Sequence, residues 1–403
     1  MAKRGADRKR VCMVAYTDYS GDARVRREAE TVATLPEFEV RVLCLMEGPK
    51  PRTDTRNGVI IEELNLRKYS GKSQGGYLLS YAVFLMLAFV RVTSLFLRGN
   101  LDLVHVHNMP DLLVITSIIP RLFGKKLILD IHDTMPETYN ATFSGDGKGL
   151  LRHLMGHLLS IEEVLCCGLA HKVICVNEIQ RLVVVKRGVR KSKTLVSMNV
   201  PDPTIFNYSD GPSLDVSRVV GFRVVYHGTI SRRLSIDVAL RALASLRERI
   251  QGLEFCIIGG GKDVEDLKRL SDSLGLTEVT KFLGKKSLEQ VAELLRSMDL
   301  GVVPSGRNPA TELMLPVKML ECIALGIPVV VPRLPAIEFY FSEDMVSYFE
   351  PGDWQSLAAA ILDMYQDSTT RRSKAMAAKR FLEEYGWDKH KWGLIRAYRG
   401  IFQ

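Results

Sequence analysis

Residues 312–332, ELMLPVKMLECIALGIPVVVP, run from a helical pattern directly into a short strand that is apolar throughout. The apolar spacing after Pro316 predicts a helix with one buried face, and PVVVP predicts a strand buried on both faces. Such strands are typical of a parallel sheet covered by helices on both sides. This stretch therefore predicts an α/β fold with a doubly wound parallel sheet.

The same alternation of strand and helix runs along most of the chain. Strand-like stretches include RVCMVAYT, EVRVLCL, LDLVHVH, KLILDIHD and KVICVN in the first half, and RVVYHG, EFCIIGG, VTKFLG and LGVVPS in the second. The alternation breaks where prolines, Asn, Asp, Gly and Ser crowd residues 198–217, which indicates a linker. We predict a first domain at 1–200 completed by a C-terminal helix at 386–403, a linker at 201–217, and a second domain at 218–385.

Composition restricts the class of protein. With 403 residues, 46% of them hydrophobic and 25% charged, the chain suits two globular domains and excludes wholesale disorder. A net charge of +9 suits anionic ligands, nucleic acid or an acidic membrane face. The seven cysteines stand in apolar runs without metal-type spacing, so we expect free buried thiols and a reducing, cytoplasmic environment.

One segment, residues 77–99, is unusually apolar: YLLSYAVFLMLAFVRVTSLFLRG. Its uninterrupted apolar part, residues 81–90, ends at Arg91, and a membrane span needs roughly 20 apolar residues. We therefore do not predict a transmembrane helix. Two interpretations stay open: a core or half-exposed helix, and a helix attached at the membrane interface.

The helix start near Pro316 suggests a binding site. Proline suits the first helical position, and the free N–H groups of Leu315 to Lys318 together with the helix dipole would attract an anion. Lys318 adds a full charge, and Glu321, one turn along, can accept hydrogen bonds from paired hydroxyls. Phosphate beside a diol describes a nucleotide with its ribose. The alternative is a solvated Lys and Glu on an amphipathic helix.

A second strand–loop–helix stretch, VVYHGTISRRLSIDVALRAL, supports the first. Arg232 and Arg233 lie in its loop, where a planar guanidinium suits a diphosphate, and we expect Ser235 to cap the helix. Exposed basic loop residues are the alternative. The glycines of CIIGGGKDVEDLK, beginning at Gly259, would allow a ligand close to the backbone, although the dinucleotide fingerprint GxGxxG is absent.

In this order, the motifs resemble the retaining glycosyltransferases of the family 4 type, the glycosyl transferases group 1, which have the GT-B fold. The resemblance covers nearly the whole chain. It is carried by GDARVRREAETVATLPEFEVRVLCL, LDLVHVHNMPDLL, KLILDIHDTMPE, VICVNEIQRLVV, SMNVPDPTIF, VVYHGTISRR, FCIIGGG, VTKFLG, GVVPS, LPVKMLECIALGIPVV and YGWDKHKWGLIRAY. It implies two Rossmann-like domains that face each other across a cleft.

The resemblance assigns the donor ribose to Glu321 and the donor diphosphate to Lys318 with Arg233 or its neighbour Arg232. Residues 282–284 would lie against the base. The full set expected to bind the nucleotide sugar is Gly21, Gly228, Arg232, Arg233, Gly259, Phe282, Leu283, Leu315, Pro316, Lys318 and Glu321.

Three residues are expected to act in catalysis by the same resemblance. His132 would contact the transferred sugar, and Asp22, with Gly21, would line the cleft from the first domain. His107 in HVHN is expected to be a satisfied histidine at a strand end.

The third catalytic candidate, Glu312, marks a departure from the family pattern. The family's usual motif has two glutamates separated by seven residues, and counting back from Glu321 reaches Leu313. Glu312 stands one residue too early, so a shifted loop, a backbone amide or reduced activity would have to account for the difference. Similarly, the loop lysine usual in the family has no match at Leu234.

The main hypothesis is a glycosyltransferase that uses a nucleotide-diphosphate sugar, with retention and without a metal or other cofactor. No Asp-x-Asp pair occurs in the sequence, and aimed N–H groups with Lys318 and Arg233 would stabilise the leaving phosphate. The expected acceptor is a carbohydrate or lipid-linked precursor of a surface polysaccharide or glycolipid, at the inner face of the membrane.

Two alternatives remain. One is a nucleotide-sugar epimerase of the same fold, and the other is a catalytically weak nucleotide-sugar-binding scaffold, which Leu313 favours. A nucleic-acid partner is not expected, because the basic residues are scattered and lack interleaved aromatic residues.

Overall fold

The computed structural model describes residues 8–69, 71, 73–142, 149–207 and 221–403. The chain divides into two compact units, one of Met1–Met198 with His390–Gln403 and one of Asn199–Lys389. The predicted linker, 201–217, lies outside the described residues from 208 onward. The predicted domain limits therefore stay a prediction.

The first unit is built on an eight-stranded sheet with the strand order β3-β4-β2-β1-β5-β6-β7-β8. Every pairing is parallel except that of β3 with β4, an edge hairpin that the sequence analysis missed. Its turn is Asn57–Gly58, where both residues have positive φ (49° and 79°), a frequent hairpin signal. The strands are β1 Lys9–Ala15, β2 Phe38–Leu45, β3 Thr53–Arg56, β4 Val59–Leu64, β5 Leu103–His107, β6 Lys126–Ile131, β7 Lys172–Cys175 and β8 Thr194–Val196.

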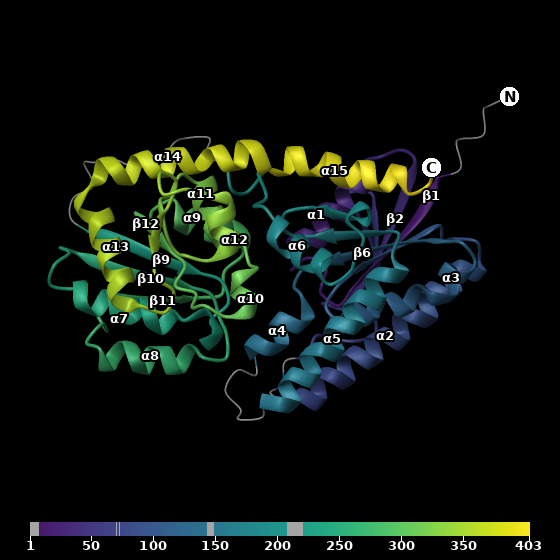
Figure 1. Cartoon of the computed structure of the whole chain (residues 1–403), viewed down its shortest axis with the longest axis horizontal. Helices are drawn as coiled ribbons and strands as arrows, with labels where there is room; N and C mark the ends of the chain where they lie inside the picture. The colour runs from purple at the N-terminus through teal and green to yellow at the C-terminus, as the bar shows by residue number, and fades with distance from the viewer. Residues whose placement is uncertain (1–7, 70, 72, 143–148, 208–220) are drawn as a thin grey trace. The chain divides into compact units, whose positions relative to one another are not determined.

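Helices cover both faces of this sheet. α2, η1, α5 and α6 contribute to one core cluster on one face, and α1 packs on the other (Figure 1). All seven cysteines are free and buried, as predicted. The helical elements are α1 Ala23–Ala33, α2 Gln74–Leu97, η1 Asp111–Ser117, α3 Ile118–Leu122, α4 Met135–Thr142, α5 Gly149–Leu169, α6 Glu178–Lys186 and η2 Lys191–Lys193, with α15 Trp387–Gly400 reaching into this unit from the C-terminal side.

The second unit has a six-stranded, wholly parallel sheet in the order β11-β10-β9-β12-β13-β14. Its strands are β9 Phe222–His227, β10 Leu253–Ile258, β11 Thr280–Gly284, β12 Leu300–Val302, β13 Val329–Pro332 and β14 Ser347–Phe349. Its helical elements are η3 Arg232–Leu234, α7 Ile236–Leu246, α8 Val264–Ser273, α9 Leu288–Leu295, α10 Pro309–Glu312, α11 Val317–Ala324, α12 Pro335–Tyr340, α13 Trp354–Gln366 and α14 Ser368–Tyr385. The two units confirm the predicted fold class of two doubly wound α/β domains.

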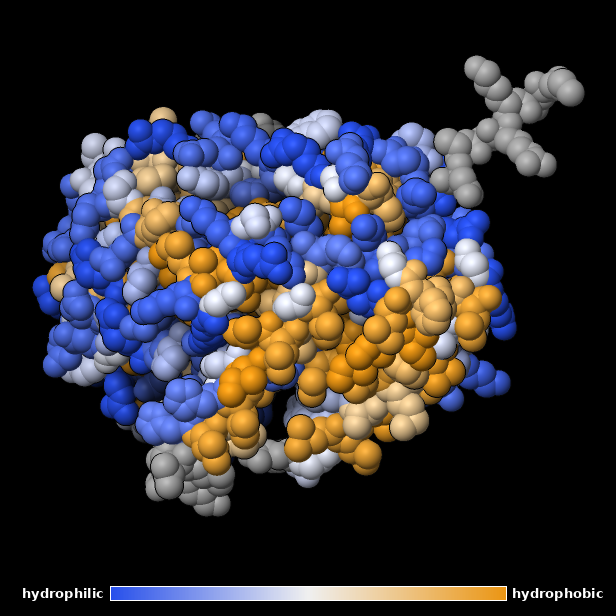
Figure 2. Space-filling model, turned by 45° about the vertical axis from the view of Figure 1, so that its right-hand side comes forward, coloured by the Kyte–Doolittle hydropathy of each residue, from blue (hydrophilic) through white to orange (hydrophobic). Residues whose placement is uncertain are grey.

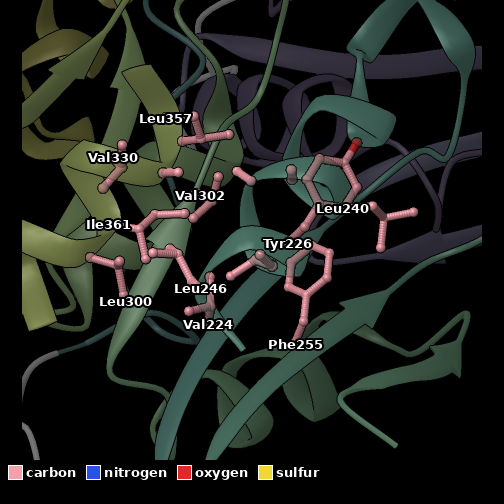
Figure 3. Packing of buried hydrophobic residues seen from close by; sticks show 14 of the residues in the cluster. Val224, Tyr226, Leu240, Leu246, Phe255, Leu300, Val302, Val330, Leu357 and Ile361 are labelled. Carbon is pink, nitrogen blue, oxygen red and sulfur yellow. The ribbon is translucent and has the colours of Figure 1, made fainter. Parts of the chain in front are cut away.

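A core cluster of strand and helix side chains holds the second unit together. Figure 3 shows Val224 and Tyr226 of β9 and Phe255 of β10 packed with Leu240 of α7 and Ile361 of α13. These side chains are 1% exposed or less. Apolar residues at helical spacing in α7 and α13 thus bury one face of the sheet, which leaves the strand ends for polar groups.

The strand orders locate the switch point of each sheet. In the first unit the chain proceeds from β1 to β2 on one side and later to β5 on the other. In the second unit β10 and β12 flank β9 in the same way. Ligands of open parallel sheets bind beyond the carboxyl ends of the strands at such a point. The residues that follow β1, β5, β6, β9 and β10 are therefore best placed for function.

Two loops of the second unit pack backbone against backbone at this edge. Ile230 donates its N–H to the Gly260 carbonyl at 3.0 Å, and Gly228 donates to the Ile258 carbonyl at 2.9 Å. A Cβ on Gly259 would lie 1.9 Å from the Gly228 carbonyl oxygen, and one on Gly261 would lie 1.8 Å from that of Ile230. The glycines make room for the neighbouring loop, whereas the sequence analysis expected them to make room for a ligand.

We expect Gly261→Ala to lower the stability of the second unit by roughly 1–3 kcal/mol, because the added methyl group meets rigid backbone. Gly260→Ala is the matched control, since its Cβ would meet only the flexible Lys285 side chain. Thermal unfolding followed by circular dichroism compares the two variants. Equal melting temperatures would contradict the backbone contact.

Candidate functional site

A buried ion pair stands at the switch point of the first unit. Arg24 of α1 donates two hydrogen bonds to Asp130 of β6, from Nε at 2.8 Å and from Nη2 at 2.7 Å. Both side chains are almost fully buried, with 2% and 0% exposure. Removing only one partner of a buried ion pair is strongly destabilising, because the charge of the other partner then stays buried without compensation. The pair therefore fixes α1 against the end of β6.

Asp130 also holds the predicted catalytic residue His132. Asp130 Oδ2 lies 3.0 Å from His132 Nε2 and 3.1 Å from His107 Nδ1. These two ring nitrogens lie 3.2 Å from each other. Burial lowers the pKa of His132, but the Asp130 carboxylate outweighs it and raises that pKa overall. Burial likewise opposes ionisation of Asp130, yet Arg24 and His132 hold its pKa well below the usual range. His132 is partly exposed, so it can meet a ligand.

Behind His132 the network continues into the core. His105 Nδ1 lies 2.6 Å from the Tyr398 hydroxyl of α15, and its ring stacks on that of His107. His107 is only partly satisfied, contrary to expectation, because its Nε2 has no hydrogen-bond partner among the described residues. His105 Nε2 and Glu28 Oε2 also lack one there, and they lie 4.0 Å from each other.

The groups that could ligate a metal are Glu28, His105, His107 and Asp130. One ligand atom from each lies within 4.8 Å of the others. Arg24 already pairs with both carboxylates, at 3.1 Å from Glu28 Oε1 and 2.7 Å from Asp130 Oδ1. We therefore interpret the cluster as a buried polar network around a guanidinium.

The predicted cleft residues Gly21 and Asp22 lie at the start of α1. Asp22 is the N-cap of α1, and its Oδ1 accepts hydrogen bonds from the N–H groups of Arg24 and Val25 at 3.2 and 3.1 Å. Asp22 also contributes to the raised pKa of His132, which places it near that ring. Gly21 precedes this cap, and a Cβ there would meet the end of the Asp18 side chain at 2.1 Å, a side chain that can move aside.

In the second unit, Glu321 of α11 pairs with a histidine that the sequence analysis missed. His227, the last residue of β9, places Nε2 2.6 Å from Glu321 Oε2, and both side chains are largely buried. Pro316 is the N-cap of α11, with extended backbone (φ −68°, ψ 121°), and not the first helical residue as predicted. Met319 donates the first bond back to the Pro316 carbonyl, so the N–H groups of Val317 and Lys318 form the open helix start.

Lys318 is held over a buried tyrosine. Its Nζ donates to the Tyr226 hydroxyl at 2.8 Å and lies 4.3 Å from the centre of that ring. The hydroxyl in turn donates to the Thr229 carbonyl at 2.6 Å. Burial lowers the pKa of Lys318 to about 8, with Arg233 adding to the effect and Glu321 opposing it. An anion at this position would find a cation already oriented toward the strand ends.

The structure separates the two candidate arginines. Arg232 pairs with Asp266 of α8 at 3.0 Å and its backbone N–H donates to Asp263 at 2.9 Å, while its side chain is 80% exposed. Arg233 instead lies close enough to Lys318 and Tyr226 to lower the pKa of both groups. Arg233 is therefore the better candidate for a diphosphate.

A hollow of 480 Å³ lies beside η3. Arg232, Arg241, Asp237, Asp263 and Asp266 supply its charged lining, and Lys318 and Glu321 do not contribute to it. Because Arg232 already pairs with Asp266, we do not place a phosphate there.

Two expectations at this edge were wrong in detail. Ser235 precedes α7 in the left-handed conformation (φ 54°, ψ 41°) and makes no side-chain cap; its Oγ accepts the N–H of Gly306 at 3.2 Å. The helix expected to start with Pro316 begins at Val317, and Pro316 is its N-cap. Glu312 ends the separate helix α10 and pairs with Arg307 at 3.0 Å, and Leu313 follows as its C-cap.

The other predicted donor residues gather at the strand ends of the same sheet. Gly228 follows β9 with φ 115°, and a Cβ there would lie 3.4 Å from Lys318 Nζ. Phe282 packs against the core from the edge strand β11, and the next residue, Leu283, is half-buried. Leu315 precedes the α11 N-cap and is half-buried, while Gly259 touches the 228–230 turn.

The sequence analysis missed the residues that hold the candidate site, Arg24, Asp130, Tyr226 and His227, and the residues behind them, Glu28, His105 and Tyr398. The sequence of each unit nevertheless contains a stretch that points to such residues. LILDIHD carries a charged residue inside a strand that is otherwise apolar, and VVYHG ends a buried strand with two polar side chains. The paired residues are far apart in the sequence: 106 residues for Arg24 and Asp130, 92 for Tyr226 and Lys318, and 94 for His227 and Glu321. Local sequence patterns could therefore not connect them.

Comparison with known proteins agrees with this arrangement. Residues 221–381 match the family model described as Glycosyl transferases group 1. A D-inositol 3-phosphate glycosyltransferase of Salinispora arenicola is 29% identical over 191 residues, 44% of this chain and 41% of the relative. The chain spans about half the length of the curated relatives it matches first.

Solved structures show the fold over nearly the whole chain. Sucrose-phosphate synthase from Thermosynechococcus elongatus has a TM-score of 0.78 at 16% identity, covering 98% of this chain and 99% of that one. Anabaena Alr3699/HepE in complex with UDP-glucose has a TM-score of 0.70 at 17% identity, covering 97% and 99%. The protein therefore has the GT-B fold of glycosyltransferases, and its second unit has the sequence pattern of group 1.

We expect Asp130→Asn to cost up to about 3–5 kcal/mol of stability, because the buried Arg24 loses its two hydrogen bonds to a carboxylate and keeps only Glu28, at 3.1 Å, as a charged partner. The pKa of Asp130 is lowered in the folded state, so the stability it supplies is present above about pH 3.9 and is lost as pH falls. The difference between wild type and variant should therefore shrink in acid. Denaturant unfolding at several pH values measures it.

The control for this variant is Asp102→Asn, which removes a more exposed carboxylate paired with Lys125 at 2.9 Å. We expect it to cost at most about 1 kcal/mol. If Asp130→Asn folds, the pKa of His132 should fall in NMR titrations. An unchanged His132 pKa would show that Asp130 does not set the charge of that ring.

Proposed function

We propose that this protein is a glycosyltransferase that transfers a sugar from a nucleotide-diphosphate donor, with retention and without a metal. The observation that carries the proposal is the cluster at the start of α11. Lys318, Arg233 and two open helix N–H groups are placed for a diphosphate, and Glu321 lies one turn further for a ribose. The match of residues 221–381 to the group 1 family supports it.

The electrostatics of this cluster fit a leaving nucleotide diphosphate. Breaking the bond between sugar and phosphate puts negative charge on the phosphate, and fixed donors stabilise charge where it develops. Lys318 is held by Tyr226, and Glu321 is held by His227, so neither needs to reorganise. In the proposed retaining reaction the leaving phosphate accepts the proton of the acceptor hydroxyl on the same face of the sugar.

His132 is the proposed contact to the transferred sugar from the first unit. The Asp130 carboxylate outweighs burial and raises the pKa of His132, which favours the protonated ring, a donor for a sugar hydroxyl. The Arg24–Asp130 pair positions the ring and takes no part in the reaction itself. Because Glu312 pairs with Arg307, its proposed catalytic role requires that pair to open when donor binds.

We further propose a carbohydrate or lipid-linked acceptor, used in surface-polysaccharide or glycolipid assembly at the cytoplasmic side of a membrane. The net charge of +9 and the apolar helix α2 support an acceptor of this kind.

Binding of UDP, GDP, ADP and dTDP, measured by calorimetry, is the first test. We expect one of them to bind selectively and Glu321→Ala to weaken that binding about tenfold or more, because a charge-assisted hydrogen bond to the ribose is worth about 1.5–3 kcal/mol. Mass spectrometry of the matching nucleotide sugar with candidate acceptors then tests transfer. A folded protein that binds none of the four would overturn the donor site.

The neighbouring arginines give a sharper test of the geometry. We expect Arg233→Ala to weaken nucleotide-diphosphate binding about tenfold or more, and Arg232→Ala to weaken it much less, because Arg232 is engaged with Asp266. Both variants remove the same charge from the same loop. The reverse ranking would place the diphosphate on the α8 side of η3.

Nucleotide-diphosphate affinity should depend on pH through Lys318. Its pKa of about 8 in the free protein means that the side chain loses its charge as pH rises through 8, so affinity should fall between pH 7 and pH 9. Binding above pH 8 should then take up a proton, seen as a buffer-dependent heat in calorimetry. Lys318→Arg, which keeps its charge, should give a flat profile.

A further inference from the structure

The exposed apolar side chains of this protein are concentrated on one side of the first unit. Among the described residues, twenty large hydrophobic side chains are exposed, and sixteen belong to three neighbouring segments: seven to α2, four to residues 111–123 and five to α5. We call this surface the apolar face. Figure 2 shows hydrophobic side chains gathered into one large area on that side.

The apolar face is a single continuous surface. α2 and α5 both pack onto η1, and all three contribute side chains to the same core cluster. The rings of Phe96 and Phe123 are 5.4 Å apart and join α2 to the end of α3. On α2 the outward positions recur every four residues at Ala82, Met86 and Val90, which is the period of one helix face. A large continuous patch of exposed apolar side chains marks an interaction surface.

α2 lies along the surface and does not cross a bilayer. Residues 75–97 are long and apolar enough for a span, with a mean hydropathy of 1.9. However, Phe84, Ala88 and Val92 are fully buried in the core of the first unit. The strands on either side of α2, β4 and β5, belong to the same sheet. A spanning α2 would have to leave that core and break the sheet.

The charges of the apolar face point to an anionic partner. Among the described residues of 74–98, 111–126 and 153–169, none that is exposed is acidic, and the half-buried Glu162 of α5 has a pKa that burial raises, which disfavours its charged form. Cations gather where the helices end. Arg98 caps α2, Arg121 donates to the Leu169 carbonyl at the end of α5, and Lys193 donates to the Gly168 carbonyl beside it. Basic residues at the edge of an apolar helix face favour anionic lipids.

We propose that the apolar face docks on the surface of an anionic lipid bilayer, with α2 and α5 lying in the interface and their basic ends among the lipid headgroups. A second copy of the chain fits this face less well. A two-fold interface pairs a face with itself, and the cations of one copy would meet no exposed carboxylate on the other.

The matched pair Met86→Glu and Met376→Glu tests the proposal with the full chain. Met86 on α2 is 69% exposed and Met376 on α14 is 65% exposed, so the two changes are alike except in place. Co-sedimentation uses vesicles of phosphatidylcholine alone and of phosphatidylcholine with phosphatidylglycerol. We expect binding to the anionic vesicles, a loss of about tenfold or more for Met86→Glu, and none for Met376→Glu.

Two further measurements separate the contributions of the helices and of charge. Ile161→Glu on α5 should reduce binding as Met86→Glu does, because both helices insert. The double variant R98Q/R121Q should weaken binding to anionic vesicles and leave the weak binding to neutral ones unchanged, and raising the salt concentration should act in the same direction.

Three outcomes would overturn the proposal: no binding to either vesicle, equal binding of the two methionine variants, or a lipid-free dimer that Met86→Glu dissociates. Sedimentation velocity without lipid detects the dimer. The proposal does not rest on the proposed transferase activity. Nucleotide-diphosphate binding in lipid-free buffer reports on the second unit, so that failure of one idea leaves the other standing.

Discussion

A parallel sheet that is covered on both faces can present polar groups only where its strands end, and both units of this protein obey that constraint. The polar side chains of the candidate site stand near a strand end or within the first two turns of a helix. His132 follows β6, His227 closes β9, and Lys318 opens α11. Elsewhere the strands carry apolar side chains toward the helices. The position of the chemistry is therefore a consequence of how the sheets are buried.

The two units stabilise their polar groups by different means. The first buries a cation and a carboxylate together, and Arg24 compensates Asp130 at the cost of taking both out of water. The second uses a hydroxyl and an imidazole as partners: the Tyr226 hydroxyl orients Lys318, and the His227 ring orients Glu321. A buried ion pair gives rigidity. A lysine whose pKa burial has lowered to about 8 remains responsive to an incoming anion.

Much of this could be predicted from the sequence, because helix starts and buried strands leave local patterns. Lys318 and Glu321 were found since one helical turn relates them, and the fold class followed from the alternation of strands and helices. What failed depends on backbone conformation or distant contacts. Ser235 adopts the left-handed conformation and makes no side-chain cap. Arg232 and Arg233 are distinguished by the α8 carboxylate that pairs with Arg232 and by the closeness of Arg233 to Lys318. Whether α2 was half-exposed could be decided only once its neighbours were placed.

The contact between residues 228–230 and 259–261 has a consequence for the engineering of this protein. The two loops touch through backbone atoms, with no side chain between them to absorb a change in length. An insertion or deletion in one loop must therefore be matched in the other, or the ends of β9 and β10 will separate. A graft of either loop from a related chain should therefore bring the other loop, 31 residues away in the chain, with it.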